Sequence, residues 1–295
     1  MDENGRAAWL NDALTEVFLG LAESSTLAGR LIYKGARILD RRLNRTERAS
    51  LDIDANLTAE FVAQFPSRDV QRAELEREIS QSIARRVRQH DPVRYALERV
   101  RVDLNPPQSH PLGFDAFTVR IRLRDLRFPG VHALPPIEMD IAAPESLSSA
   151  SVAPMSVGDR TVQAYTLHRI AGEKLRALLQ SLPEHRAKMR RPGGAVRAKD
   201  MYDLARILDV YPITDTPFWR IVGEEFVEAC RSRFVDCADG ATFEQALAVT
   251  QRSYETDSTI PADRTWPAAL HALRTISAFL AQNEFVGLRY PLPSV

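Results

Sequence analysis

Apolar and polar residues alternate in several short segments of the first half of the chain, whereas apolar residues recur three or four positions apart in the second half. Alternation predicts half-buried strands, and the longer spacing predicts amphipathic helices. We therefore expect an α+β protein. Residues 1–165 should form a core of mixed or antiparallel sheet with flanking helices, and residues 166–295 a helical lobe.

The pattern predicts individual elements as well. Strands are expected at 31–33, up to Asp54, and at 95–105, 116–126, 137–142 and 162–165, with a Ser/Ala-rich link over 145–156. Helices are expected at 9–21, 36–43, from Ser67 or Asp69 to about 89, and at 167–182, 197–208, 219–234, 243–252 and 266–282.

Two aspartates mark the first candidate site. Asp52 and Asp54 share one face of their strand, whereas Leu51 and Ile53 point to the other face, into a core. Two close carboxylates repel each other unless a cation lies between them, and Mg²⁺ binds carboxylates together with substrate phosphates. Surface or turn acids remain the alternative reading, because such a pair on a strand is common.

The turn upstream of these aspartates suits an anion. Lys34 and Gly35 precede the helix expected at 36–43. The N–H groups at a helix N-terminus form an anion site, and glycine allows the backbone to approach a phosphate closely. An ordinary strand-to-helix turn remains the other explanation.

A third carboxylate lies on the strand expected at 137–142. Glu138 and Asp140 share one face of it. If this strand lies beside the one that carries Asp52 and Asp54, Asp140 completes a three-carboxylate metal site. The sequence does not show whether the two strands are neighbours.

Charged residues interrupt the apolar faces of two later helices. Lys174 lies within the apolar stripe of the helix at 167–182, so it needs an anionic partner unless its amine extends to solvent. Asp200 lies on the apolar side of the helix at 197–208, and Asp203 is one turn further on. The basic loop at 186–197 is a candidate phosphate contact or a solvated loop.

Composition narrows the function classes. The 295 residues contain 39 Lys+Arg and 39 Asp+Glu, so no overall charge attracts nucleic acid or membrane. Cys230 and Cys237 indicate neither a disulfide framework nor a zinc site. No apolar run approaches the length of a membrane span, and the polar start does not resemble a signal peptide, so a cytoplasmic protein without membrane contact is expected.

Five motifs in order carry a family resemblance. They are Lys34-Gly35 before a helix, Asp52-Ile53-Asp54, the strand with Asp140, the helix segment with Lys174, and the segment Arg197 to Leu204 with Asp200 and Asp203. Over residues 31–208 this order resembles the AbiEii/AbiGii toxin family of nucleotidyltransferases. The resemblance implies a polymerase-β-like nucleotidyltransferase core joined to a helical C-terminal lobe.

The resemblance also implies an activity. The protein would be the toxin of a bacterial toxin–antitoxin pair acting in abortive infection, with an antitoxin partner, a nucleoside triphosphate as substrate and a tRNA 3′ end or a protein as acceptor. The implied metal ligands for two Mg²⁺ ions are Asp52, Asp54 and Asp140, and Lys174 and Asp200 join them as catalytic residues. The implied nucleotide-binding residues are Lys34, Gly35, Ala36, Arg37, Lys174 and Asp203.

One motif departs from the family. Members usually carry Gly-Gly-Ser/Thr or Gly-Ser at the phosphate turn, whereas this chain has Gly35-Ala36-Arg37. The hydroxyl is missing, and Arg37 would supply part of its interaction. Two further hypotheses follow: a catalytically decayed nucleotide-binding module of the same fold, and an antibiotic-type nucleotidyltransferase with a small-molecule acceptor.

Overall fold

The computed structural model describes residues 3–45, 52–128, 130, 134–189, 196–237, 240–245 and 247–293. The chain divides into two compact units. Unit 1 comprises Met1–Ile38, Ala49–Glu145 and Ala153–Ala164, and unit 2 comprises Leu39–Arg48, Ser146–Val152 and Tyr165–Val295. Leu51 and residues 190–195 of the basic loop lie outside the described residues.

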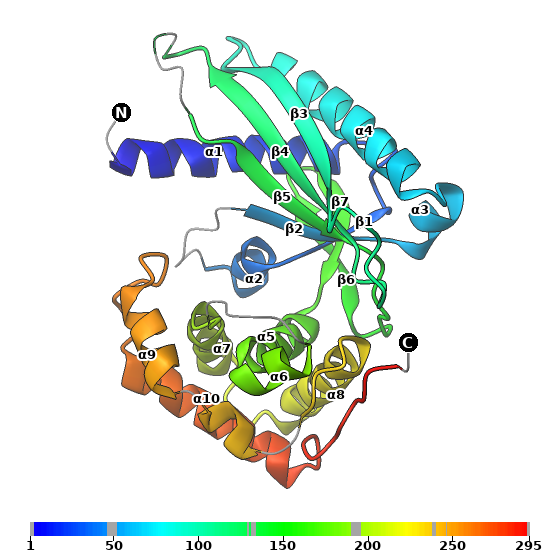
Figure 1. Ribbon diagram of the computed structural model, residues 1–295. Helices are drawn as coiled ribbons and strands as arrows, with labels where there is room; N and C mark the ends of the chain where they lie inside the picture. The colour runs from blue at the N-terminus through cyan, green and yellow to red at the C-terminus, as the bar shows by residue number, and fades with distance from the viewer. Residues whose placement is uncertain are drawn as a thin grey trace. The chain divides into compact units, whose positions relative to one another are not determined.

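A seven-stranded mixed sheet forms the centre of unit 1 (Figure 1). Its strands in chain order are β1 (Leu31–Lys34), β2 (Asp52–Leu57), β3 (Tyr95–Asn105), β4 (Ala116–Asp125), β5 (Ile137–Ala142), β6 (Val152–Val157) and β7 (Arg160–Tyr165). Across the sheet they run in the order β3-β4-β5-β2-β1-β7-β6. β2 pairs in parallel with β5 and antiparallel with β1, and β1 pairs in parallel with β7.

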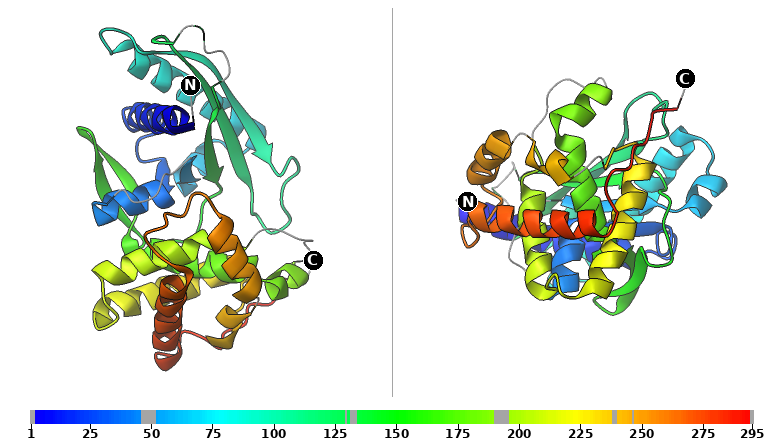
Figure 2. Two further views of the ribbon diagram at one scale, coloured as in Figure 1. Left: turned by 90° about the vertical axis from the view of Figure 1, so that its left-hand side faces the viewer. Right: turned by 90° about the horizontal axis from the view of Figure 1, so that it is seen from below.

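One face of the sheet is apolar, and helices cover it. Ile53 on β2, Val119 on β4 and Met139 on β5 are almost completely buried. The helices of unit 1 include α1 (Glu3–Ala22), α3 (Ala59–Gln64) and α4 (Arg68–Arg88). α4 packs against β3 and α1, as Figure 1 and the left view of Figure 2 show. The opposite face carries the polar residues of the same strands.

α2 (Ala36–Leu43) starts in unit 1 directly after Gly35 and ends in unit 2. The other helices of unit 2 are α5 (Leu167–Ser181), α6 (Pro183–Lys188), α7 (Lys199–Val210), α8 (Thr216–Ser232), the short 3₁₀ helix η1 (Gly240–Glu244), α9 (Leu247–Thr256) and α10 (Trp266–Gln282). The Thr166 hydroxyl caps α5 by accepting a hydrogen bond from the Arg169 N–H. Phe218, Trp219, Phe226 and Phe279 are buried, as their spacing predicted.

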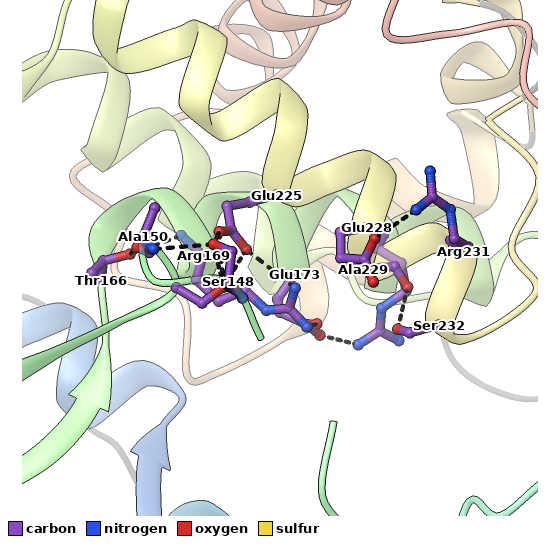
Figure 3. A network of polar contacts seen from close by, with 12 residues as sticks. Ser148, Ala150, Thr166, Arg169, Glu173, Glu225, Glu228, Ala229, Arg231 and Ser232 are labelled. Carbon is purple, nitrogen blue, oxygen red and sulfur yellow. Dashed lines mark hydrogen bonds and ion pairs between the residues drawn. The ribbon is translucent and has the colours of Figure 1, made fainter. Parts of the chain in front are cut away.

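A buried polar network fastens α8 to α5 in unit 2 (Figure 3). Ser148 and Ser151 donate hydrogen bonds of 2.7 and 2.8 Å to Glu225, and the Arg169 guanidinium lies 3.2 Å from the same carboxylate. α5 and α8 also approach closely: a Cβ on Gly172 would lie 2.7 Å from a backbone nitrogen of α8. Glycine is required where two helix backbones meet at this distance.

Most of the predicted elements agree with the structure, and three differ. β2 does not end at Asp54 but begins at Asp52 and continues to Leu57, because Ala55 and Leu57 are buried and pair with β1. The Ser/Ala-rich link contains β6, whose Met155 and Val157 are buried. The helix predicted at 243–252 is split into η1 and α9, with Phe243 packed on Phe226. Among the described helices, none is long and apolar enough to span a bilayer.

Candidate functional site

Asp54 and Asp140 lie directly opposite each other on neighbouring strands of unit 1. β2 and β5 run in parallel, and their register pairs Asp54 with Asp140 and Asp52 with Glu138. Because side chains alternate along a strand, all four carboxylates belong to one face of the sheet. The adjacency that the sequence left open is therefore present.

β4 provides a hydroxyl beside this pair. Thr118 lies opposite Asp140, and its Oγ1 donates a hydrogen bond of 3.0 Å to Asp140 Oδ1. Asn105 of β3 in turn donates to Thr118 Oγ1 at 3.3 Å. The hydrogen bonds orient the carboxylate of Asp140, which remains exposed. Sequence analysis did not single out Thr118, because a threonine on a strand is ordinary until its neighbour is known.

Gly35 is held tightly beneath Asp54. Its φ is +83°, and a Cβ on it would lie 2.1 Å from Asp54 Oδ2. The positive φ and this contact each exclude a larger side chain. The group that closely approaches Gly35 in this structure is thus the carboxylate of Asp54, and the predicted approach of a phosphate to the Gly35 backbone remains a prediction.

The other residues of this turn have protein contacts. The Lys34 amine lies 3.6 Å from the Glu145 carboxylate. Ala36 is buried as the first residue of α2. Arg37 donates hydrogen bonds of 3.3 and 3.4 Å to the side chains of Asn11 and Thr15 in α1. Their assignment to nucleotide binding remains a prediction.

The donor set of unit 1 suits a hard cation. Asp52, Asp54 and Asp140 offer carboxylate oxygens, the ligands that Mg²⁺ prefers. Among the described residues, no three His, Cys, Asp or Glu side chains form a ready-made metal cage. Mg²⁺ is commonly held by one or two carboxylates together with substrate phosphates, so the neighbouring carboxylates of Asp54 and Asp140 fit such an ion without a third protein ligand.

A second group of charges is buried within unit 2. The Lys174 amine of α5 lies 3.1 Å from Asp200 Oδ1 and 2.6 Å from Asp203 Oδ2 of α7. Lys174 is 8% exposed, and both aspartates are almost completely buried. The lysine on the apolar stripe therefore has anionic partners and does not extend to solvent.

Two arginines extend this group. The Arg197 guanidinium lies 2.7 Å from Asp200, and that of Arg206 lies 3.7 Å from Asp203. Arg206 also lies 2.8 Å from Asp40 of α2 and donates to the carbonyl oxygen of Arg45. Sequence analysis did not single out Asp40 or Arg206. The signal was present, because Arg206 lies between the core residues Leu204 and Ile207.

These charges control the ionisation of Asp200. Burial would raise its pKa, but the positive charges of Arg197 and Lys174 and their hydrogen bonds outweigh burial and hold the pKa well below its usual range. Because the folded-state pKa is depressed, the ionised carboxylate stabilises the fold above its unfolded pKa of about 3.9, and this contribution declines as pH falls below that value.

Replacement of Asp200 by asparagine is therefore expected to be pH-dependent. Asp200→Asn should lower the free energy of unfolding at pH 7, and the difference from wild type should shrink by about 1 kcal/mol between pH 5 and pH 3. Urea unfolding across that range measures both quantities. A constant difference across the range would contradict the assignment of a depressed pKa.

Comparison with known proteins follows from this geometry. A family model described as "Nucleotidyl transferase AbiEii toxin, Type IV TA system" matches residues 19–276. The chain is similar in structure to MenT4, a nucleotidyltransferase toxin from Mycobacterium tuberculosis H37Rv, with a TM-score of 0.52 and 15% identity over 96% of this chain and 88% of that chain. This likeness confirms the predicted fold class. No curated protein matches the sequence.

Proposed function

This chain belongs to the AbiEii family of nucleotidyl transferase toxins of type IV toxin–antitoxin systems, and from that premise we propose that it transfers a nucleotide from a nucleoside triphosphate to the 3′ end of an acceptor RNA with Mg²⁺ bound. A toxin of this class implies an antitoxin partner and a nucleoside triphosphate substrate. The observation that carries the proposal is the direct pairing of Asp54 with Asp140 on one face of the sheet.

The metal would be held by Asp54 and Asp140, with Asp52 as a further ligand on the same face. When bound, Mg²⁺ neutralises charge on the triphosphate and on the transition state of transfer. Gly35 positions the carboxylate of Asp54, since a Cβ there would collide with it. The chain thus supplies oxygen ligands on rigid strands, which hold such geometry better than loops do.

The transfer step forms one bond and breaks one. The acceptor hydroxyl oxygen bonds to the α-phosphorus, the bridging oxygen to the β-phosphorus leaves with pyrophosphate, and the hydroxyl proton passes to a base. We assign that base to Asp140, whose Oδ1 is oriented by Thr118 and whose carboxylate is exposed. Roles for Lys174 and Asp200 in stabilising pyrophosphate remain predictions and are tested below by substitution.

The central test uses Asp54→Asn, which keeps the shape of the side chain and removes its charge. Transfer of α-labelled nucleotide to bulk tRNA with Mg²⁺ is expected to fall by at least about 100-fold, because even indirect partners of metal ligands contribute about 10–100-fold. Each of the four labelled triphosphates is assayed in turn. Glu138→Gln is the matched control, because Glu138 lies on the same sheet face but its carboxylate is paired with Arg120 at 3.3 Å.

Each outcome of this assay separates the hypotheses. Label on RNA with wild type and Glu138→Gln but not Asp54→Asn supports the proposal. Mg²⁺-dependent thermal stabilisation by triphosphate without any transfer would favour the decayed module, for which the hydrogen bonds of Arg37 to α1 are the supporting observation. Label on a small hydroxyl compound and none on RNA would favour the antibiotic-type enzyme. Label on protein alone would reassign the acceptor.

A further inference from the structure

We propose that the exposed face of β3 and β4 in unit 1 binds the phosphate backbone of the acceptor RNA. The inference rests on the proposed function, whose acceptor it places on the protein. Five exposed arginines define this surface, which we call the arginine face: Arg99, Arg101, Arg120, Arg122 and Arg124. All five lie on the sheet face opposite the one that α4 covers, and they contain no lysine among them.

Register places these arginines in opposed pairs. Arg99 lies directly opposite Arg122, and Arg101 lies directly opposite Arg120. Like charges in directly opposed positions of an antiparallel pair destabilise a sheet. The fold alone therefore gives no reason for two such pairs side by side.

Only part of this charge is neutralised within the protein. Asp103 lies 2.8 Å from Arg101 and 3.0 Å from Arg120, and Glu98 lies 3.8 Å from Arg124. By contrast, Arg99 and Arg122 form no hydrogen bond or ion pair with any other residue in the described parts of the chain. An opposed, exposed and uncompensated arginine pair points to an anion that comes from outside the chain.

The chemistry of the face favours phosphate in an extended polymer. The guanidinium fork binds phosphate oxygens with two parallel hydrogen bonds. Residues two apart on a strand are separated by about 6.8 Å and neighbouring strands by about 4.8 Å, so the arginine face presents cations in successive rows. A single phosphate would contact one row, whereas an RNA backbone contacts several.

The same sheet face leads directly to the carboxylates. On β4, Thr118 contacts Asp140, Arg120 lies two residues further, and Arg122 two residues beyond that. Arg122 is thus about 14 Å along the strand from the row of Asp140. An RNA strand whose backbone lies on Arg99 and Arg122 can place its end at Asp54 and Asp140, with no other surface required.

The test compares two pairs of neutralising substitutions in the full-length protein. Binding of 5′-fluorescein-labelled bulk tRNA is measured by anisotropy without triphosphate, from 50 to 300 mM KCl. Arg99→Gln with Arg122→Gln is expected to weaken binding by on the order of tenfold at 100 mM salt and to reduce the slope of log K against log salt by about 1.4. Its melting temperature should equal or exceed that of wild type, because the like-charge pair is gone.

Arg85→Gln with Arg88→Gln provides the matched control. Both arginines are exposed on α4, which packs against the covered face of the sheet, and the net charge change is identical. The control should bind tRNA within about twofold of wild type, since nonspecific charge alone has a small effect when phosphate contacts are unchanged. An equal loss in both variants would overturn the proposal, as would no loss in Arg99→Gln with Arg122→Gln.

Competitors and turnover separate the remaining explanations. Displacement of the tRNA by polyglutamate at equal charge concentration would assign the arginine face to an acidic protein, and displacement by Mg²⁺-ATP would assign it to the triphosphate. Transfer activity with an unchanged KM for tRNA in Arg99→Gln with Arg122→Gln would reject the surface but keep the proposed function. Salt-dependent tRNA binding through these arginines without transfer would keep the surface and reject the function.

Discussion

Replacing Lys174 with methionine is expected to lower the free energy of unfolding by about 3 kcal/mol. Methionine matches the length of the side chain but leaves the carboxylates of Asp200 and Asp203 buried without the ammonium that lies 3.1 and 2.6 Å from them. The expected loss is at the lower end of the usual 3–5 kcal/mol for breaking a buried pair, because Arg197 and Arg206 remain as partners. Urea unfolding at pH 7 measures it.

Two further variants make this result specific. Lys188→Met removes a lysine that bonds Asp236 at 2.8 Å in a half-exposed setting, so its effect should be about 1 kcal/mol. Combining Lys174→Met with Asp203→Asn should cost less than the two single changes added together, because the second change removes a repelling charge. Strict additivity would contradict the coupled cluster.

The same variant tests the predicted part of Lys174 in catalysis. Nucleotide transfer is measured at a temperature where Lys174→Met is fully folded, and the rate is expressed per folded molecule. A loss beyond about tenfold, with the KM for triphosphate raised, supports direct stabilisation of the phosphates. An unchanged rate per folded molecule would restrict Lys174, and with it Asp200, to holding α5 and α7 together.

Replacing Gly35 with alanine is expected to abolish transfer, with a decrease of at least about 100-fold. The added Cβ would lie 2.1 Å from Asp54 Oδ2 and 3.0 Å from its carboxyl carbon, so the carboxylate must leave its position opposite Asp140. The positive φ adds a conformational cost of about 1–2 kcal/mol to the folded state. Both effects follow from one methyl group.

Gly29→Ala separates the two effects. Gly29 has a φ of +75°, and a Cβ on it would meet nothing within 4 Å. This control should therefore show the loss of stability from the positive φ but keep transfer per folded molecule. Melting temperature and transfer rate are measured for both variants. Full transfer by Gly35→Ala would mean that the position of Asp54 does not govern the reaction.

Prediction from sequence succeeded where local periodicity and local chemistry decide the outcome. The strands β3 and β5 and the helices α2 and α10 have the predicted bounds, because strict alternation or helical spacing leaves one face of each to be buried. The Thr166 cap was predicted for a similar reason, since the capping bond lies within four residues. β6 was missed because the polar and small residues around it hide Met155 and Val157.

Parts of the candidate site depended on contacts between distant segments. The pairing of Asp54 with Asp140 joins residues far apart in the chain, and strand register is set by packing of the apolar face as a whole. Thr118 and Arg206 gained significance only through their partners, Asp140 and Asp40. No periodicity marks such residues, since each has the spacing of an ordinary strand or helix position.

The sequence by itself determined the α+β class, the order of the motifs, the face on which each carboxylate would project, and the need of Lys174 for an anionic partner, because all of these follow from side-chain direction and burial within single elements. The tertiary structure alone decided that β2 lies beside β5, that Asp54 covers Gly35, and that Arg99 faces Arg122 without compensation. These depend on which strands become neighbours, a choice made by long-range packing of the sheet.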